Sequence, residues 1–162
     1  MYPFVVTLYC LLSTSLFAQQ PVDSTRVRTE KMNKIFEEEI IPYLESRDSV
    51  PDWAGFGKHL ISLYGDTGEE VLLMSQTIYS MQRDDWANFS TAIIPYARKY
   101  GSNIPAKQRH AFSEYMSRNA QLLYQSGHKE EGIRWQILAL PLAAETEHAG
   151  MLDTIEKMKR GE

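Results

Sequence analysis

The sequence predicts an all-α protein built from antiparallel helical hairpins, either in a repeat array or in an irregular bundle of about six to seven helices. Apolar residues recur at intervals of three and four along most of the chain, which is the period of a helix with one buried face. No stretch shows the alternation of a β-strand, and no Asn-Gly or Asp-Gly dipeptide marks a hairpin turn. Short connections between the periodic segments favour antiparallel neighbours.

Turn signals separate the helices of the first hundred residues. Residues 47–51 interrupt the first periodic run, and Asp52 opens the next helix. Gly65 ends that helix at a position suited to a left-handed cap, and a third helix is expected from Gly68 or Glu69. The fourth begins at Asp84–Asp85, and Pro95 should kink it or end it early. The expected buried faces are Met32, Ile35, Phe36, Ile40 and Tyr43; Trp53, Phe56, Leu60, Ile61 and Tyr64; Val71, Leu72, Ser75, Ile78 and Tyr79; and Trp86, Phe89, Ile93, Ala97 and Tyr100.

Proline and glycine also delimit the later helices. A helix should begin at Ile104–Pro105 and end at Gly127, and another should end before Pro141. A last, shorter helix is expected near the C-terminus. The expected buried faces are Phe112, Tyr115, Met116, Asn119, Leu122 and Leu123; Ile133, Gln136, Ile137 and Leu140; and Met151, Leu152, Ile155 and Met158.

The N-terminus resembles an export signal. Residues 1–18 carry no charged side chain, and their apolar run is shorter than the roughly 20 residues of a membrane-spanning helix. We therefore expect a signal peptide at 1–18, a flexible segment at 19–26 and one α-helical domain at 27–160, released into the periplasm or secreted from a bacterial cell without stable membrane insertion. The sequence leaves open the exact cleavage site and whether Cys10 is lipidated.

Composition argues against several classes of function. Cys10 is the only cysteine and lies in the expected signal, so the mature chain would have no disulfide and no thiolate nucleophile. With 17 Lys and Arg against 21 Asp and Glu, the chain lacks the basic surface that nucleic-acid binding requires. We therefore expect no nucleic-acid partner and no cofactor.

Residues 122–140 resemble the second part of a tetratricopeptide repeat unit. Gly127 lies in the turn between two helices, and Gly132 and Ala139 are seven residues apart, where that repeat places small residues so that helices can approach closely. Ala120 occupies the corresponding small position in the preceding helix. The resemblance implies helical hairpins that bind a protein or a peptide.

A broader resemblance covers roughly residues 51–140. The strings Asp85-Trp-Ala-Asn-Phe89, Pro95-Tyr-Ala-Arg-Lys-Tyr-Gly101 and Leu122-Leu-Tyr-Gln-Ser-Gly127 are similar to the helical region that accompanies the thioredoxin fold in some secreted bacterial proteins. The Cys-x-x-Cys motif and the βαβ units are missing here. What the resemblance implies is only a helical partner-binding or scaffolding part. A further alternative is that the chain is an accessory subunit of a separate thioredoxin-like protein.

No catalytic or metal-binding set emerges from the polar residues. The four histidines form no pair at helical spacing, and Glu147 and His148 would point in different directions on a helix. Asp84 and Asp85 suit a helix N-terminus better than paired acid catalysis. We expect a protein that is not an enzyme and holds no metal. The alternative is a small extracytoplasmic hydrolase that uses Asp84, Asp85 or Glu147 with a histidine.

The aromatic residues suggest where a partner could bind. Most helical aromatic residues belong to the core, but Trp135 lies off the stripe of Ile133, Gln136, Ile137 and Leu140. The predicted partner-binding residues are Trp135, Tyr96, Lys99 and Arg134. The sequence therefore predicts an exported, non-catalytic interaction or scaffold module.

Overall fold

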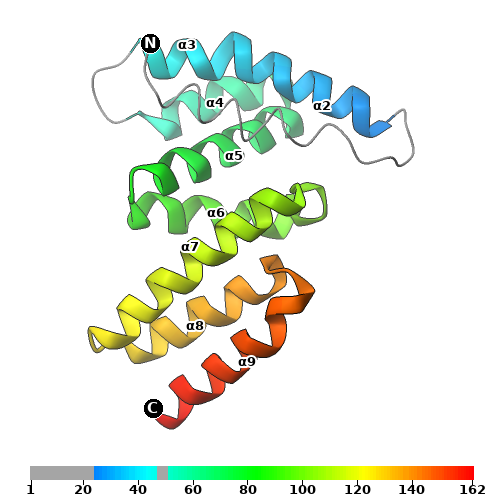
Figure 1. Ribbon diagram of the computed structural model, residues 1–162. Coiled ribbons are helices and arrows are strands. Elements are labelled where there is room, and N and C mark those ends of the chain that lie inside the picture. Colours follow the sequence, from blue (N-terminus) through cyan, green and yellow to red (C-terminus); the bar gives the residue numbers. More distant parts are fainter. Residues whose placement is uncertain (1–23, 47–50) are drawn as a thin grey trace. The chain divides into compact units, whose positions relative to one another are not determined.

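The computed structural model describes residues 24–46 and 51–162, and in these ranges the chain forms helices and no strand. The predicted all-α fold is therefore confirmed. Residues 1–23, which include the expected signal peptide, lie outside the described residues. The helices are α2 Ser24–Ile35, η1 Phe36–Ile40, α3 Ile41–Glu45, α4 Trp53–Tyr64, α5 Asp66–Gln82, α6 Trp86–Tyr100, η2 Gly101–Asn103, α7 Ala106–Gln125, α8 Lys129–Ala139, η3 Leu140–Leu142 and α9 Glu145–Arg160 (Figure 1).

The contacts divide the chain into two compact units. Unit 1 ends at Tyr100 and unit 2 comprises residues 101–162. The grouping of residues 27–160 into one domain stays a prediction. No helix in the described part of the chain combines the length and apolar character needed to cross a bilayer.

In unit 1, α2, η1 and α3 follow one another without a break, with a π-helical turn in the middle. Pro42 explains this turn, because proline has no N–H to donate and its ring clashes with the carbonyl four residues earlier in a regular α-helix. The wider turn is closed by a hydrogen bond from Ile41 N to Phe36 O. The expected apolar face is confirmed at Met32, Ile35, Phe36 and Ile40, which are buried. The helix begins at Ser24, inside the segment 19–26 that the sequence predicts to be flexible.

The hairpin of α4 and α5 depends on a helix cap and a glycine contact. Asp52 accepts a hydrogen bond of 3.0 Å from Gly55 N, as expected for a residue that opens a helix. Gly65 has a φ of 58°, a conformation that favours glycine. A Cβ atom at Gly68 would lie 2.3 Å from the carbonyl oxygen of Leu60, so only glycine allows the two helices to approach this closely.

The central helix of unit 1 is α5, which contacts α4, α6 and α2. Its buried residues occur all around the helix rather than on one stripe, as expected for a helix surrounded by others. They include the predicted residues together with polar ones: Gly68, Glu70, Val71, Leu72, Met74, Ser75, Thr77, Ile78, Tyr79 and Ser80.

Helix α6 continues through Pro95 to Tyr100, so the prediction that Pro95 could end it early is wrong. Pro95 is exposed, and so is Thr91, whose carbonyl loses its partner because proline has no N–H. Water can satisfy that carbonyl, which lowers the cost of a proline at this position.

In unit 2, α7 and α8 form a tightly packed hairpin, and α9 is tied to it by polar contacts. A Cβ atom at Gly132 would lie 2.6 Å from the carbonyl oxygen of Ala120, which confirms the close approach expected from these small residues. The buried Ser113 hydroxyl donates to Ala139 O at 3.0 Å. From the other end of α7, the Tyr124 hydroxyl donates to Met158 O of α9 at 2.8 Å.

Some helices are rotated relative to the predicted buried face, so that residues expected in the core are exposed. Ile61, Leu122, Ile137 and Leu152 were all expected in the core, and all are exposed. The last helix, expected to be short, has 16 residues against 11 in α8. The largest consequence concerns α8, because it changes which residues are available to a partner.

Candidate functional site

Trp135 lies in the core, with only 2% of its surface exposed. The expectation that it lies off the buried face is therefore wrong. The reason is that Gly132 and Ala139 face α7 at close range, and Trp135 shares their side of the helix together with Gln136. Gln136 is held there by a hydrogen bond of 3.2 Å from its amide nitrogen to the Ser117 hydroxyl.

Tyr96 is also buried, with 1% of its surface exposed, so it does not form the polar rim that the sequence suggested. Burial raises the pKa of the Tyr96 hydroxyl well above its ordinary value, and the nearby Glu70 carboxylate raises it further. Tyr96 therefore stays neutral inside unit 1.

Lys99 lies at the surface of unit 1 and forms salt bridges with two acidic residues of α5. Its ammonium binds Asp66 at 3.0 Å and Glu69. Hydrogen bonds to Glu69 and then Asp66 raise the pKa of Lys99, which keeps it charged. These bonds join the end of α6 to the start of α5, which is a structural role within unit 1.

Arg134 is exposed, and unlike Lys99 it belongs to none of the salt bridges found in the described part of the chain. It lies 5.9 Å above the Trp135 ring, so its guanidinium covers the buried indole from outside. Ile137 and Leu138 follow one turn later on the same side of α8, with 46% and 36% of their surfaces exposed. We call Arg134, Ile137 and Leu138 the α8 outer face.

Ile137 and Leu138 are the residues that sequence reasoning missed. Their apolar character placed Ile137 in the expected core stripe, whereas the small residues Gly132 and Ala139 define the true buried side. Seven residues make nearly two helical turns, so these two small residues lie above one another. A helical projection centred on them would have placed Ile137 and Leu138 on the opposite side.

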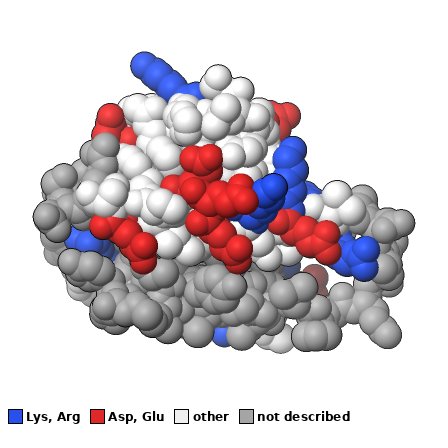
Figure 2. All heavy atoms as spheres, turned by 90° about the horizontal axis from the view of Figure 1, so that it is seen from above, with Lys and Arg blue, Asp and Glu red and all other residues white. Residues whose placement is uncertain are grey.

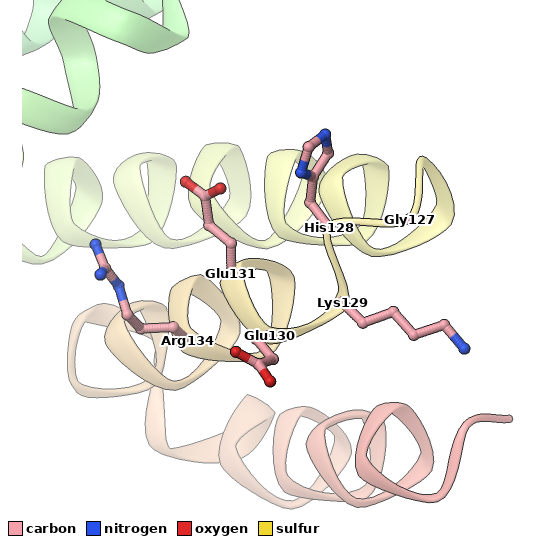
Figure 3. A pocket seen from close by; sticks show the side chains of 6 residues that line it. All are labelled: Gly127, His128, Lys129, Glu130, Glu131 and Arg134. Carbon is pink, nitrogen blue, oxygen red and sulfur yellow. The ribbon is translucent and has the colours of Figure 1, made fainter.

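A hollow of about 680 Å³, lined mainly by charged residues, lies beside the α8 outer face, at the turn between α7 and α8. The turn itself requires glycine, because Gly127 has a φ of 97°. Figure 3 shows His128, Glu131 and Arg134 pointing to one side of α8, whereas Glu130 points to the other. The lining residues are Gly127, His128, Lys129, Glu130, Glu131 and Arg134. Such a mixed-charge, diverging set suits contact with a polar surface better than enclosure of a small ligand.

The described surface also carries charge of both signs elsewhere. Seen from above, Asp and Glu side chains form a band across one face, with Lys and Arg side chains beside it (Figure 2). Along α2 and η1, charged residues pair at a spacing of four, as in the contacts of Arg26 with Glu30 and Lys34 with Glu38. Exposed pairs of this kind contribute little to stability.

Asp85, one of the candidate acids, acts as the cap of α6. It accepts hydrogen bonds from Asn88 N at 3.1 Å and from the Asn88 side-chain amide at 2.7 Å. These hydrogen bonds lower the pKa of Asp85 below 3.8. Its neighbour Asp84 adopts a positive φ of 56° in the turn before the helix.

We expect Asp85→Ala to destabilise unit 1 by about 1 kcal/mol at neutral pH, because the cap of α6 is lost. A carboxyl group with a lowered folded-state pKa stabilises the fold above its unfolded value of 3.8 and loses this effect as the pH falls. Urea unfolding at neutral pH and near pH 3 measures the loss of stability in the variant and its dependence on pH. An equal loss at the two pH values would contradict the capping role, and Asp84→Asn is the matched control, since asparagine tolerates the positive φ of that position.

Glu147 lies beside His110, a histidine that the sequence did not single out. Its carboxylate lies 3.3 Å from Nδ1 of His110 on α7 and accepts a hydrogen bond from Ala144 N at the start of α9. Glu114 lies 3.6 Å from the other nitrogen of His110. The nearby Ser113 hydroxyl is buried and bound to a carbonyl, so it is not placed as a nucleophile. The arrangement joins α9 to α7.

No group of three or more histidine, cysteine, aspartate or glutamate residues within 24–46 and 51–162 is arranged to hold a metal ion. The cluster of Glu145, Glu147 and His148 therefore does not converge there. Comparison of the chain with protein-family models, characterised proteins and solved structures finds no match. The resemblances to tetratricopeptide repeats and to thioredoxin-associated helices accordingly stay predictions.

Proposed function

We propose that this chain is an exported helical interaction module that binds a protein or peptide partner through the α8 outer face. The observation that carries the proposal is the exposure of Ile137 and Leu138 next to each other on a helix whose opposite side is packed against α7. Neighbouring apolar residues beside a charged rim are typical of the centre of a protein interface.

The packing of α8 supports a rigid binding surface. Gly132 and Ala139 hold one side of the helix against α7, and Trp135 anchors it from within. The outer face is therefore presented on a fixed helix rather than on a loop, which lowers the entropy that a partner must overcome on binding. Arg134 can contribute a charged hydrogen bond at the edge of the apolar pair.

A photo-crosslinking residue placed at Ile137 in the full-length protein tests this proposal in intact cells. We expect a discrete crosslinked partner from position 137 and none from Leu122, which is a similarly exposed apolar residue of unit 2 on α7. The double variant Ile137→Ser, Leu138→Ser should reduce capture of that partner by about tenfold or more, whereas Leu122→Ser should leave it unchanged.

Equal crosslinking from positions 137 and 122, or none from either, would contradict the proposed surface. A thioredoxin-like protein as the partner would identify the chain as the accessory subunit that the sequence resemblance suggests. Hydrolysis of a model substrate that His110→Ala and Glu147→Gln both abolish would instead favour the hydrolase alternative.

Export is a separate prediction of the same proposal. In bacterial expression we expect the protein in the periplasmic or secreted fraction, with a mature N-terminus at Gln19. Cell fractionation and mass spectrometry of the N-terminal peptide measure both properties. A cytoplasmic protein that still carries residues 1–18 would contradict export, and a variant with an arginine pair replacing two apolar residues of the signal is the control for failed export.

A further inference from the structure

Glu70 is the one charged residue that is buried within 24–46 and 51–162, with 4% of its surface exposed. It lies on the central helix α5 and is bound by Arg28 of α2, which is 42 residues away in the sequence. Arg28 Nε donates to one carboxylate oxygen at 3.2 Å, and a terminal guanidinium nitrogen binds the other oxygen. This two-point contact joins two helices that are far apart in the chain.

Several other titratable groups on the elements around α5 have partners or surroundings of their own. From α6, Tyr96 lies near Glu70 as a neutral hydroxyl, while Lys99 and Tyr100 bind Asp66 and Glu69 at the start of α5. From η1 and α4, Glu39 binds Tyr64 and lies 3.4 Å from His59. The cation that balances Glu70 is therefore Arg28.

The first half of α2 makes few other contacts that would fix it to α5. The buried apolar residues of this helix begin at Met32, whereas Val27 is exposed and no residue from Thr25 to Lys31 is buried. Hydrophobic burial thus fastens the second half of the helix, whereas the first half meets α5 through the contact between Arg28 and Glu70.

We propose that the contact between Arg28 and Glu70 is a latch: the charge state of the buried Glu70 side chain decides how firmly residues 24–31 lie on α5. The physical basis is that taking a carboxylate out of water is costly, and a single cation offsets that cost only in part. Removing Arg28 leaves the buried Glu70 charge without a counter-charge. Neutralising Glu70 removes the cost of burying that charge.

The direction of the pH response follows from the same balance. Burial raises the pKa of Glu70 above 4.5 although the Arg28 contact lowers it, so burial is the larger effect. The docked helix therefore binds a proton more readily than the released one, in which Glu70 meets water. Docking is strongest below pH 4.5 and weakens as the pH rises through the docked-state pKa. Acidification tightens the latch, and a return to neutral pH loosens it.

Hydrogen exchange of the peptide containing residues 24–31, measured in the full-length protein and corrected for intrinsic rates, tests the latch. Arg28→Met should lower the protection of this peptide by about tenfold or more, because the buried carboxylate loses its partner. Glu70→Gln should keep or raise the protection and remove its dependence on pH between about 4 and 8. Arg26→Met is the matched control, since Arg26 lies on the same helix but pairs with the exposed Glu30.

Equal effects of Arg28→Met and Arg26→Met would overturn the proposal, and so would a loss of protection in Glu70→Gln as large as that in Arg28→Met. If Arg28→Met unfolds unit 1, the pH series of the wild-type protein and the Glu70→Gln variant still test the proposal. Protection of residues 24–31 that does not change with pH in the wild-type protein would contradict the latch. The latch belongs to unit 1, so its test does not depend on the proposed α8 outer face.

Discussion

We expect Trp135→Ala to destabilise the protein by about 3–5 kcal/mol, because it removes one of the largest side chains from the core of unit 2 and leaves a cavity. Trp135 is almost fully buried and shares the face of α8 that packs on α7. Urea unfolding followed by far-UV circular dichroism measures the change in the free energy of unfolding. If Trp135 lay at the surface and bound a partner, as the sequence pattern predicts, the same substitution would abolish partner binding and leave the helices intact.

Ile137→Ala is the control for this experiment. It truncates an apolar residue two positions away on the exposed side of α8, and we expect it to change stability by no more than about 0.5 kcal/mol. If the α8 outer face binds a partner, Ile137→Ala should weaken binding in a protein of normal stability. A stable Trp135→Ala variant that has lost its partner would show instead that the indole is the binding group.

We expect Gly132→Ala to destabilise the protein by about 1–2 kcal/mol, although alanine is the better helix former. The new Cβ atom would lie 2.6 Å from the Ala120 carbonyl oxygen. The helix backbones fix the positions of both atoms, so neither can turn aside as the end of a long side chain can. Helices α7 and α8 would have to separate, with loss of contacts along the hairpin. Gly68→Ala should have a similar effect in unit 1, where the corresponding distance to Leu60 O is 2.3 Å.

Gly150→Ala separates the packing effect from helix propensity. Gly150 lies within α9 and has no atom within 4 Å of the position that its Cβ would occupy. We expect this variant to be more stable by about 0.5–1 kcal/mol, because alanine restricts the unfolded chain and favours the helix. Equal stabilisation by Gly132→Ala and Gly150→Ala in urea unfolding would mean that α7 and α8 are not in close contact.

Local sequence signals predicted where helices begin and end with good accuracy. Asp52 and Asp85 cap the helices that they were expected to open, and Gly65 and Gly127 have the positive φ values that their turns require. These features depend on neighbouring residues alone, so they can be inferred without knowledge of the fold. Pro95 was misjudged because the cost of a proline depends on whether water can reach the carbonyl that it leaves unpaired, and this is a property of the packed structure.

The choice of buried face was harder to predict. In α8, apolar Ile137 was placed inside and Trp135 outside, and the structure reverses both. The spacing of apolar residues identifies a helix, but the nearest contact between two helices is decided by their smallest residues, because these set how closely the backbones approach. Gly132 opposite Ala120 makes that contact, and it turns Ile137 and Leu138 to solvent.

The amino-acid pattern alone is enough to establish that the chain is helical and where most helices start and stop, since both follow from interactions within a few residues of the chain. Only the tertiary structure places Arg28 against Glu70 and joins Glu147 to His110. It also decides which side of α8 is open to a partner. These features bring together residues from separate helices, whose relative rotation depends on packing across the whole unit rather than on any local preference.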